Sequence, residues 1–207
     1  MITRLFLVRH GETDWNKLGK FQGSTDIELN EAGLKQAEYV AQQLINKFDA
    51  IYSSPLKRAY KTAETIAKSK DIKPLICPGI TEINFGDWEG LTVSEIEQNF
   101  PKEFALWKKD TVEGPICGGD KSIKLACERA KASIMDIVNS NLGKDIVVVA
   151  HGGIIKAALI AIFNWDISMY HKIFLGNTSI SEIYFTDELK PVIVTINDTH
   201  HLKLDYN

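Results

Sequence analysis

Two histidines of this 207-residue chain occupy the same local setting, an apolar segment followed directly by His-Gly. His10 follows residues 5–8, and His151 follows residues 146–150. Each apolar run is typical of a buried strand, and open α/β sheets bind ligands beyond the carboxyl ends of their strands. If both strands are central, the two imidazoles share one crevice although they are far apart in the sequence. The simpler alternative is a pair of unrelated loop histidines, because a single short motif is weak evidence.

The arginines point to the same crevice. Only four of the 24 basic residues are arginines, and the others are lysines. Arg9 directly precedes His10, and Arg58 follows Ser54-Pro55, a pair typical of a helix start. A guanidinium beside a helix N-terminus binds an oxyanion through its planar fork, the free N–H groups and the helix dipole. We therefore expect Arg9 and Arg58 to bind one anionic group, and the other two arginines to be surface or salt-bridge residues.

The elements that must position these residues alternate between strands and helices. This order predicts an α/β fold, a three-layer, mostly parallel sheet with helices on both faces and an antiparallel edge strand. Capping residues such as Asn30 and a one-sided apolar pattern from Leu34 to Phe48 mark the first helix. Strands are expected at residues 5–8, 50–52, 146–150, 180–185 and 192–196, and helices after 30, over 54–68, after 92, over 122–139 and after 153.

Length and composition predict one domain over residues 1–207. Hydrophobic residues make up 44% and the net charge is −3, which excludes disordered chains and argues against a nucleic-acid partner. The longest uncharged apolar stretch, residues 157–163, is too short for a membrane span, and the N-terminus lacks a signal-peptide pattern, so we expect a cytoplasmic protein. Prolines, glycines and aromatic residues in 100–121 predict a helical insert, at about 91–121, rather than a linker.

Five ordered blocks of sequence extend these motifs nearly from end to end of the chain. They are residues 7–16, 21–23 with 26–29, 53–58 with 62–65, 82–90, and 150–153. Together the blocks resemble the histidine phosphatase superfamily, in the branch that contains cofactor-dependent phosphoglycerate mutases and related phosphatases. The resemblance implies the phosphoglycerate mutase-like fold and a single histidine-phosphatase domain over the whole chain.

The resemblance also implies residue roles that match the needs of phosphoryl transfer, a nucleophile, positive charge around the phosphoryl oxygens and an acid for the leaving group. It makes His10 the nucleophile, which forms a phosphohistidine, and Glu82 the proton donor and later the base. Phe85 and Trp88 would exclude water around Glu82 and favour its protonated form. Glu12 and Glu89 are competing carboxylates, and we interpret Glu12 as a capping or supporting residue. The resemblance assigns phosphoryl binding to Arg9, Asn16, Gln22, Gly23, Arg58, Glu82, His151 and Gly152.

Three activities follow from this resemblance. The favoured one is a phosphomonoester hydrolase of the α-ribazole phosphatase-like or broad-specificity kind, acting on a small phosphorylated metabolite. The first alternative is a 2,3-bisphosphoglycerate-dependent phosphoglycerate mutase. Mutases of the family, however, carry arginine in the corresponding insert, whereas all basic residues of 91–121 here are lysines. The second is a noncatalytic phosphate-binding regulatory protein of the same fold, which would not need both nucleophile and acid.

The resemblance and the composition also predict the partners of the chain. The sequence contains none of the usual zinc-ligand spacings, so no metal is expected, and 2,3-bisphosphoglycerate is a cofactor only for a mutase. The expected partner is a small-molecule phosphomonoester, with no nucleic acid and no membrane. A homodimer is left open.

Overall fold

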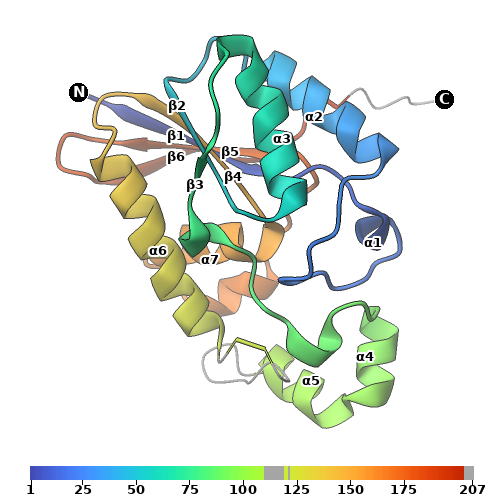
Figure 1. Ribbon diagram of the computed structural model, residues 1–207. Helices are drawn as coiled ribbons and strands as arrows, with labels where there is room; N and C mark the ends of the chain where they lie inside the picture. Colours follow the sequence, from blue (N-terminus) through green and yellow to red (C-terminus); the bar gives the residue numbers. More distant parts are fainter. Residues whose placement is uncertain (110–118, 121, 203–207) are drawn as a thin grey trace.

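The computed structural model describes residues 1–109, 119–120 and 122–202, and it has the predicted three-layer α/β architecture (Figure 1). Within these residues a six-stranded sheet forms the middle layer, in the spatial order β3-β2-β4-β1-β5-β6. The strands are β1 (Thr3–Arg9), β2 (Ala50–Ser53), β3 (Leu75–Ile76), β4 (Asp145–Ala150), β5 (Ile180–Phe185) and β6 (Pro191–Asp198).

Helices form the two outer layers and a separate group beyond one end of the sheet (Figure 1). Among the described residues, no helix has the length and apolar character that crossing a membrane requires. The α-helices are α1 (Asp14–Lys17), α2 (Glu31–Gln43), α3 (Lys57–Ala67), α4 (Val93–Asn99), α5 (Pro101–Lys109), α6 (Ile123–Asn139) and α7 (Gly152–Ile162).

The two strands that precede the histidines are parallel neighbours in the centre of the sheet. Arg9 at the end of β1 lies opposite Ala150 at the end of β4, and the N–H of His10 donates to the carbonyl of Ala150 (3.0 Å). The prediction that both strands are central is therefore confirmed. The antiparallel edge is also present, because β5 pairs antiparallel with both β1 and β6.

Alternate residues of the central strands face opposite sides of the sheet, and each side is covered. Leu5 and Leu7 pack in one cluster with residues of α6 and α7, whereas Phe6 and Val8 pack in another with residues of α2 and α3. Burial on both faces explains why these strands are uninterrupted apolar runs. The same burial fixes the ends of β1 and β4, and with them the backbone of the segments that follow.

The start of α3 differs from the prediction. The helix begins at Lys57 rather than directly after Ser54. The Ser54 hydroxyl accepts the N–H of Leu56 (3.3 Å) and lies 2.8 Å from Nε2 of His151, so it serves a tertiary contact instead of capping the first turn. Ser54, which the sequence predicts as a helix cap, thus contacts His151 instead.

The first long helix is capped as predicted but is shorter than its apolar pattern. The side chain of Asn30 accepts the N–H of Gly33 (2.8 Å) at the start of α2. Leu34 is 42% exposed, although the pattern placed it on the buried face, and Phe48 is buried beyond the end of the helix. The buried stripe therefore continues into the loop that leads to β2.

α4 and α5 are the described part of the insert predicted at about 91–121, and residues 110–118 and 121 lie outside the described residues. Thr92 caps α4 through the predicted capping box. In α5 the rings of Phe104 and Trp107 stack 5.6 Å apart, and each contacts the ring of buried Trp88 at 5.5 Å. These aromatic contacts hold the insert against the loop that contains residues 82–90.

Candidate active site

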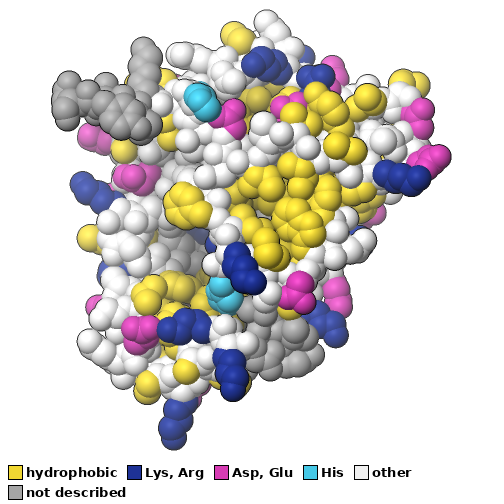
Figure 2. Space-filling view, turned by 180° about the vertical axis from the view of Figure 1, so that it is seen from behind, with side chains coloured by type: hydrophobic (Ala, Val, Ile, Leu, Met, Phe, Trp, Pro, Cys, Tyr) yellow, Lys and Arg dark blue, Asp and Glu magenta, His cyan; other side chains and the backbone are white. Residues whose placement is uncertain are grey.

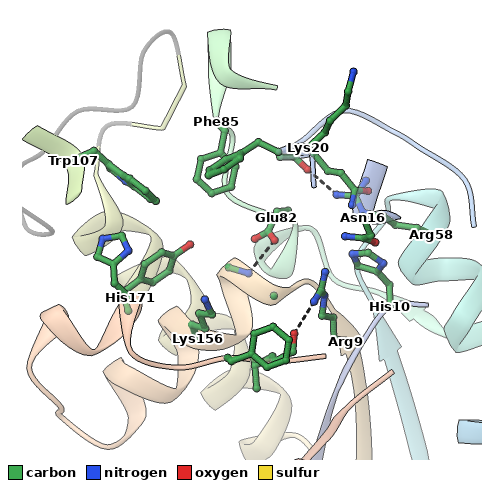
Figure 3. A pocket seen from close by; sticks show the side chains of 18 residues that line it. Arg9, His10, Asn16, Lys20, Arg58, Glu82, Phe85, Trp107, Lys156 and His171 are labelled. Atoms are coloured by element: carbon green, nitrogen blue, oxygen red, sulfur yellow. Dashed lines mark hydrogen bonds between the residues drawn. The ribbon is translucent and has the colours of Figure 1, made fainter. Parts of the chain in front are cut away.

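A cavity of about 290 Å³ lies beyond the carboxyl ends of β1 and β4. Figure 2 shows this face of the molecule hollowed, with hydrophobic, basic and histidine side chains around the hollow. Figure 3 shows Asn16, Arg58, His10 and Arg9 on one side of the cavity and Trp107 on the other, with Glu82 between them. The predicted site residues that line it are Arg9, His10, Asn16, Gln22, Gly23, Arg58, Glu82 and Gly152.

His10 is held in a defined tautomer at the end of β1. Its Nδ1 lies 2.7 Å from the carbonyl oxygen of Gly11, and a carbonyl only accepts, so Nδ1 carries the proton and Nε2 keeps a lone pair. Burial, followed by the positive charges of Arg58 and Arg9, lowers the pKa of His10 well below its ordinary value. The ring is therefore a neutral imidazole with a nucleophilic nitrogen at neutral pH.

His151 lies beside His10 but does not line the cavity. The two ring centroids are 5.1 Å apart, and His151 is fully buried. Burial and then the charge of Arg58 lower the pKa of His151 well below its ordinary value. Its Nε2 is bonded to Ser54, so Nδ1 is the ring nitrogen left for another partner.

Two guanidinium groups border His10, and the backbone fixes both. Arg58 is fully buried, and its Nη1 and Nη2 donate to the carbonyls of Thr25 and Gly23, both at 2.7 Å. Arg9 donates through Nη1 to the carbonyl of Leu175 (2.6 Å). Burial lowers the pKa of each arginine from its ordinary value, but an arginine stays charged in a protein.

Several buried polar atoms around His10 have no hydrogen-bond partner among the described residues. Buried polar groups are nearly always paired, so such a group of atoms needs an explanation. A bound oxyanion would accept hydrogen bonds from the nitrogen atoms among them, whereas Oε1 of Gln22 only accepts and would pair with a hydroxyl or N–H of the ligand. The atoms are Nε of Arg9, Oε1 of Gln22, Nε of Arg58 and Nδ1 of His151.

Glu82 crosses from its loop to the N-terminus of α7. Its Oε1 accepts the N–H groups of Ile83 (2.9 Å) and Ile154 (2.8 Å), and its Oε2 accepts that of Gly153 (2.9 Å). A Cβ at Gly153 would come within 2.7 Å of Oε1, so any side chain there would displace the carboxyl group of Glu82. Because Oε2 accepts a single N–H, it keeps a lone pair for a transferred proton.

The competing carboxylates are occupied elsewhere. Oε1 of Glu12 accepts the side-chain amide of Asn30 (2.9 Å), which supports the start of α2. Glu89 accepts the N–H groups of Ser24 (2.8 Å), Thr25 (2.9 Å) and Phe85 (3.0 Å). Glu82 is accordingly the one carboxylate among the described residues that line the cavity.

The two aromatic residues expected around Glu82 are in different places. Phe85 lines the cavity, as the sequence suggests. Trp88 is fully buried in the aromatic cluster with α5 and is not a lining residue. Trp107 and Tyr170 form the apolar wall together with Phe85.

Three further residues support the site, and the sequence analysis gave none of them this role. Asn177 donates to the carbonyl of His10 (3.0 Å) and to Oδ1 of Asn16 (3.1 Å), which leaves the Asn16 amide N–H groups for a ligand. Thr62, one turn after Arg58 and within the block 62–65 that contributes to the resemblance, accepts the N–H of Gly11 (3.1 Å). The third, Arg129, was expected to be a surface or salt-bridge residue, and it lies 3.7 Å from Oδ2 of Asp120. It also donates to the carbonyls of Gly79 and Thr81 (2.9 and 2.8 Å), just before Glu82.

The fold and this constellation define a class of proteins, and comparison with known families agrees. The model of the histidine phosphatase superfamily (branch 1) matches residues 5–199, and the chain belongs to this family. It is an enzyme of the phosphatase class.

The chain is similar over almost its whole length to phosphoserine phosphatases. It is 35% identical to phosphoserine phosphatase 1 of Hydrogenobacter thermophilus over 202 residues, which cover 97% of this chain and 95% of the relative. It is 34% identical to the metal-independent phosphoserine phosphatase of Arabidopsis thaliana, covering 97% and 84%. The crystal structure of an Entamoeba histolytica phosphoserine phosphatase mutant with phosphoserine has a TM-score of 0.89 at 40% identity, covering 97% and 99%.

The absence of a metal cofactor, expected from the sequence, agrees with the metal-independent relative in Arabidopsis thaliana. Within the part of the chain that the structure describes, no group of three His, Cys, Asp or Glu side chains could hold a metal ion.

Proposed function

We propose that the chain hydrolyses a small phosphomonoester through a phosphohistidine at His10, with Glu82 as acid and base. The observation that carries this proposal is the neutral His10, with Nε2 unprotonated, among two guanidiniums and a set of buried polar atoms without partners. Such a site offers a nucleophile and an oxyanion cradle together, which phosphoryl transfer requires.

In the first step Nε2 of His10 attacks phosphorus while the bond from phosphorus to the leaving oxygen breaks. Arg9, Arg58 and the amide of Asn16 bind the phosphoryl oxygens as charge develops on them. Gln22, the N–H of Gly23 and the helix start at Gly152 complete the cradle. In this mechanism the Ser54 hydroxyl donates a hydrogen bond to Nε2 of His151, so Nδ1 of His151 carries the ring proton. This Nδ1–H donates a hydrogen bond to another phosphoryl oxygen.

Glu82 handles the protons of both steps. Oε2 gives its proton to the leaving oxygen, so the product departs as an alcohol rather than an alkoxide. Water then loses a proton to the same carboxylate and attacks the phosphohistidine, the N–P bond breaks, and inorganic phosphate is released. The bonds from Ile83, Gly153 and Ile154 support this role because they hold the carboxyl group in one orientation.

The substrate class follows from the similar proteins. We propose a small phosphorylated metabolite of the phosphoserine type, because relatives that align over nearly the whole chain carry that name. We also propose one domain over residues 1–207, in which the insert at 91–121 shapes the pocket. Trp107 of α5 supports this, because it lines the cavity.

Acid-quenched labelling with ³²P-phosphoserine tests the proposal. We expect an acid-labile, alkali-stable phosphoryl-enzyme, unchanged in EDTA, that is absent from His10→Ala. Phosphate release from a panel of phosphorylated metabolites then ranks the substrates. Absence of label from the wild-type enzyme would contradict the proposal, and rapid isomerisation of 3-phosphoglycerate with 2,3-bisphosphoglycerate, with little phosphate released, would favour a mutase.

A further inference from the structure

The end of the cavity away from His10 has a cation of its own. Lys156 follows Gly152 by four residues on α7, so both lie on the same face, about 6 Å apart along the helix axis. Gly152 lies against the guanidinium of Arg9, since a Cβ there would be 3.5 Å from Nε of Arg9. Figure 3 shows Lys156 between Arg9 and the pair Trp107 and His171.

The ammonium of Lys156 has no anionic partner in the described part of the chain. No hydrogen bond or ion pair joins it to another described side chain. The carboxylate whose charge acts on it, Glu82, already accepts three backbone N–H groups. Burial, opposed by Glu82, lowers the pKa of Lys156 from its ordinary value. Its contact is the ring of Tyr170, with Nζ 5.3 Å from the centroid.

The neighbour of Lys156 at the rim is His171, which ends the 3₁₀ helix η4 (Ile167–His171). Its ring lies 4.7 Å from that of Trp107. Burial and then the charge of Lys156 lower the pKa of His171 from its ordinary value, and a hydrogen bond to the backbone of Trp107 opposes this shift. This end of the cavity therefore presents one ammonium, one neutral imidazole and aromatic walls, with no carboxylate beyond Glu82 among the described lining residues.

A half-buried ammonium without a counter-ion raises the free energy of the unliganded protein. The ring of Tyr170 offsets a part of that cost through a cation–π contact. An anionic group brought by a ligand would offset the remainder, which explains why the chain keeps a lysine here rather than an apolar residue. A single ammonium with a neutral imidazole suits a carboxylate, whereas a phosphate dianion calls for several cationic donors.

We propose that Lys156 forms a subsite for a substrate carboxylate, so that the enzyme selects phosphomonoesters that also carry a carboxylate. The proposal rests on the proposed function, with the phosphoryl group bound at His10. Lys156 is then a specificity residue that pairs with the carboxylate, at the end of the cavity that His171 and Trp107 border.

The test compares two substrates that differ only in the carboxylate, phosphoserine and phosphoethanolamine. We expect Lys156→Met to lower the ratio of their kcat/KM values about 10- to 100-fold, the effect of losing one charged hydrogen bond. Lys156→Arg should restore most of that ratio. Lys172→Met removes an exposed lysine of the neighbouring segment that does not line the cavity, and should leave the ratio at the wild-type value.

Equal losses on both substrates in Lys156→Met would overturn the carboxylate subsite. Calorimetric binding of the same two compounds to His10→Ala, with and without Lys156→Met, separates this inference from the proposed function, because it needs no turnover. We expect Lys156→Met to weaken phosphoserine binding and leave phosphoethanolamine binding within about twofold. A larger loss for 2,3-bisphosphoglycerate than for phosphoserine would assign the subsite to a second phosphate and contradict the carboxylate.

Discussion

The two ends of the cavity are built differently. At the His10 end, hydrogen bonds to the backbone fix three functional side chains: His10 bonds the carbonyl of Gly11, Arg9 bonds that of Leu175, and Arg58 bonds two carbonyls. At the far end, Trp107, Tyr170 and His171 meet mainly through ring contacts. Side chains can be exchanged there without moving the backbone, so the fixed end suits a reaction common to a family and the aromatic end suits selectivity.

The largest effect should follow from a change at the fixed end. We expect Arg58→Gln to lower kcat/KM by about 10³-fold, since one cationic donor to the phosphoryl group is lost and the carbonyls of Gly23 and Thr25 lose their partner. Arg129→Gln is the matched control, because Arg129 also bonds two carbonyls but does not line the cavity. Similar losses of kcat/KM at equal Tm would mean that Arg58 only supports its loop.

Glu82→Gln should have the next largest effect, and one that depends on the leaving group. An amide cannot supply the proton, so hydrolysis of phosphoserine should slow by about 10²- to 10⁴-fold. Hydrolysis of p-nitrophenyl phosphate should fall far less, because p-nitrophenolate needs little protonation. Steady-state kinetics on both substrates measure the difference, and equal losses would remove Glu82 from the acid role.

The fixed end is also the part that the sequence predicts best. Buried parallel strands are apolar runs, so β1 and β4 and the His-Gly pairs that follow them are visible locally. The supporting contacts are not visible in the sequence, because their partners are far apart in the chain. Asn177 and His10 are separated by 167 residues, and His151 and Ser54 by 97 residues. Pairings of that kind are decided by tertiary packing, which leaves no periodic signal.

At the aromatic end the sequence shows which residue types are present but not which of them line the cavity. Lys156 lies in an apolar helix, where a lone lysine suggests a solvated face. Its place in the cavity depends on α7 starting beside Arg9, which follows from the register of β4 with β1. The two-residue strand β3 was missed because both of its side chains are exposed, without the alternation that predicts a strand.

The pH dependence of the reaction should test the fixed end, with a moderate effect. Burial lowers the pKa of His10 and of His151 below the ordinary value of 6.5. Nucleophilic attack needs neutral His10, so kcat/KM for p-nitrophenyl phosphate should stay constant as the pH falls through 6.5 and decline only at lower pH. A pH–rate profile that declines with a midpoint at 6.5 would mean that His10 is accessible to water.

The same two histidines should make folding stability depend on pH. Below pH 6.5 the unfolded chain binds protons that the folded chain excludes, so their contribution is complete above 6.5 and is lost as the pH falls toward the folded pKa values. Chemical denaturation at a series of pH values measures this loss. His10→Ala should have a shallower decline between pH 6.5 and 5 than the wild type, and an unchanged slope would contradict the burial argument.

The smallest effect on the reaction rate should come from the boundary between the two ends of the cavity. This boundary lies between two lining residues that are adjacent in the sequence. Phe174 is 73% exposed, whereas Leu175 is 2% exposed and its carbonyl holds Arg9. We expect Phe174→Ala to change KM about two- to fivefold, because little apolar area is lost. Leu175→Ala should destabilise folding by about 2–5 kcal/mol and lower kcat as Arg9 shifts.

Kinetics and thermal unfolding of these two variants locate the boundary. If Phe174→Ala lowered kcat as much as Leu175→Ala does, the far wall would take part in the chemistry. If instead Leu175→Ala changed KM alone, the carbonyl would not be what positions Arg9, and the fixed end would have to be held by Arg58 and the loop that contains Gly23. A sharp boundary requires that Leu175→Ala lowers kcat and that Phe174→Ala changes KM.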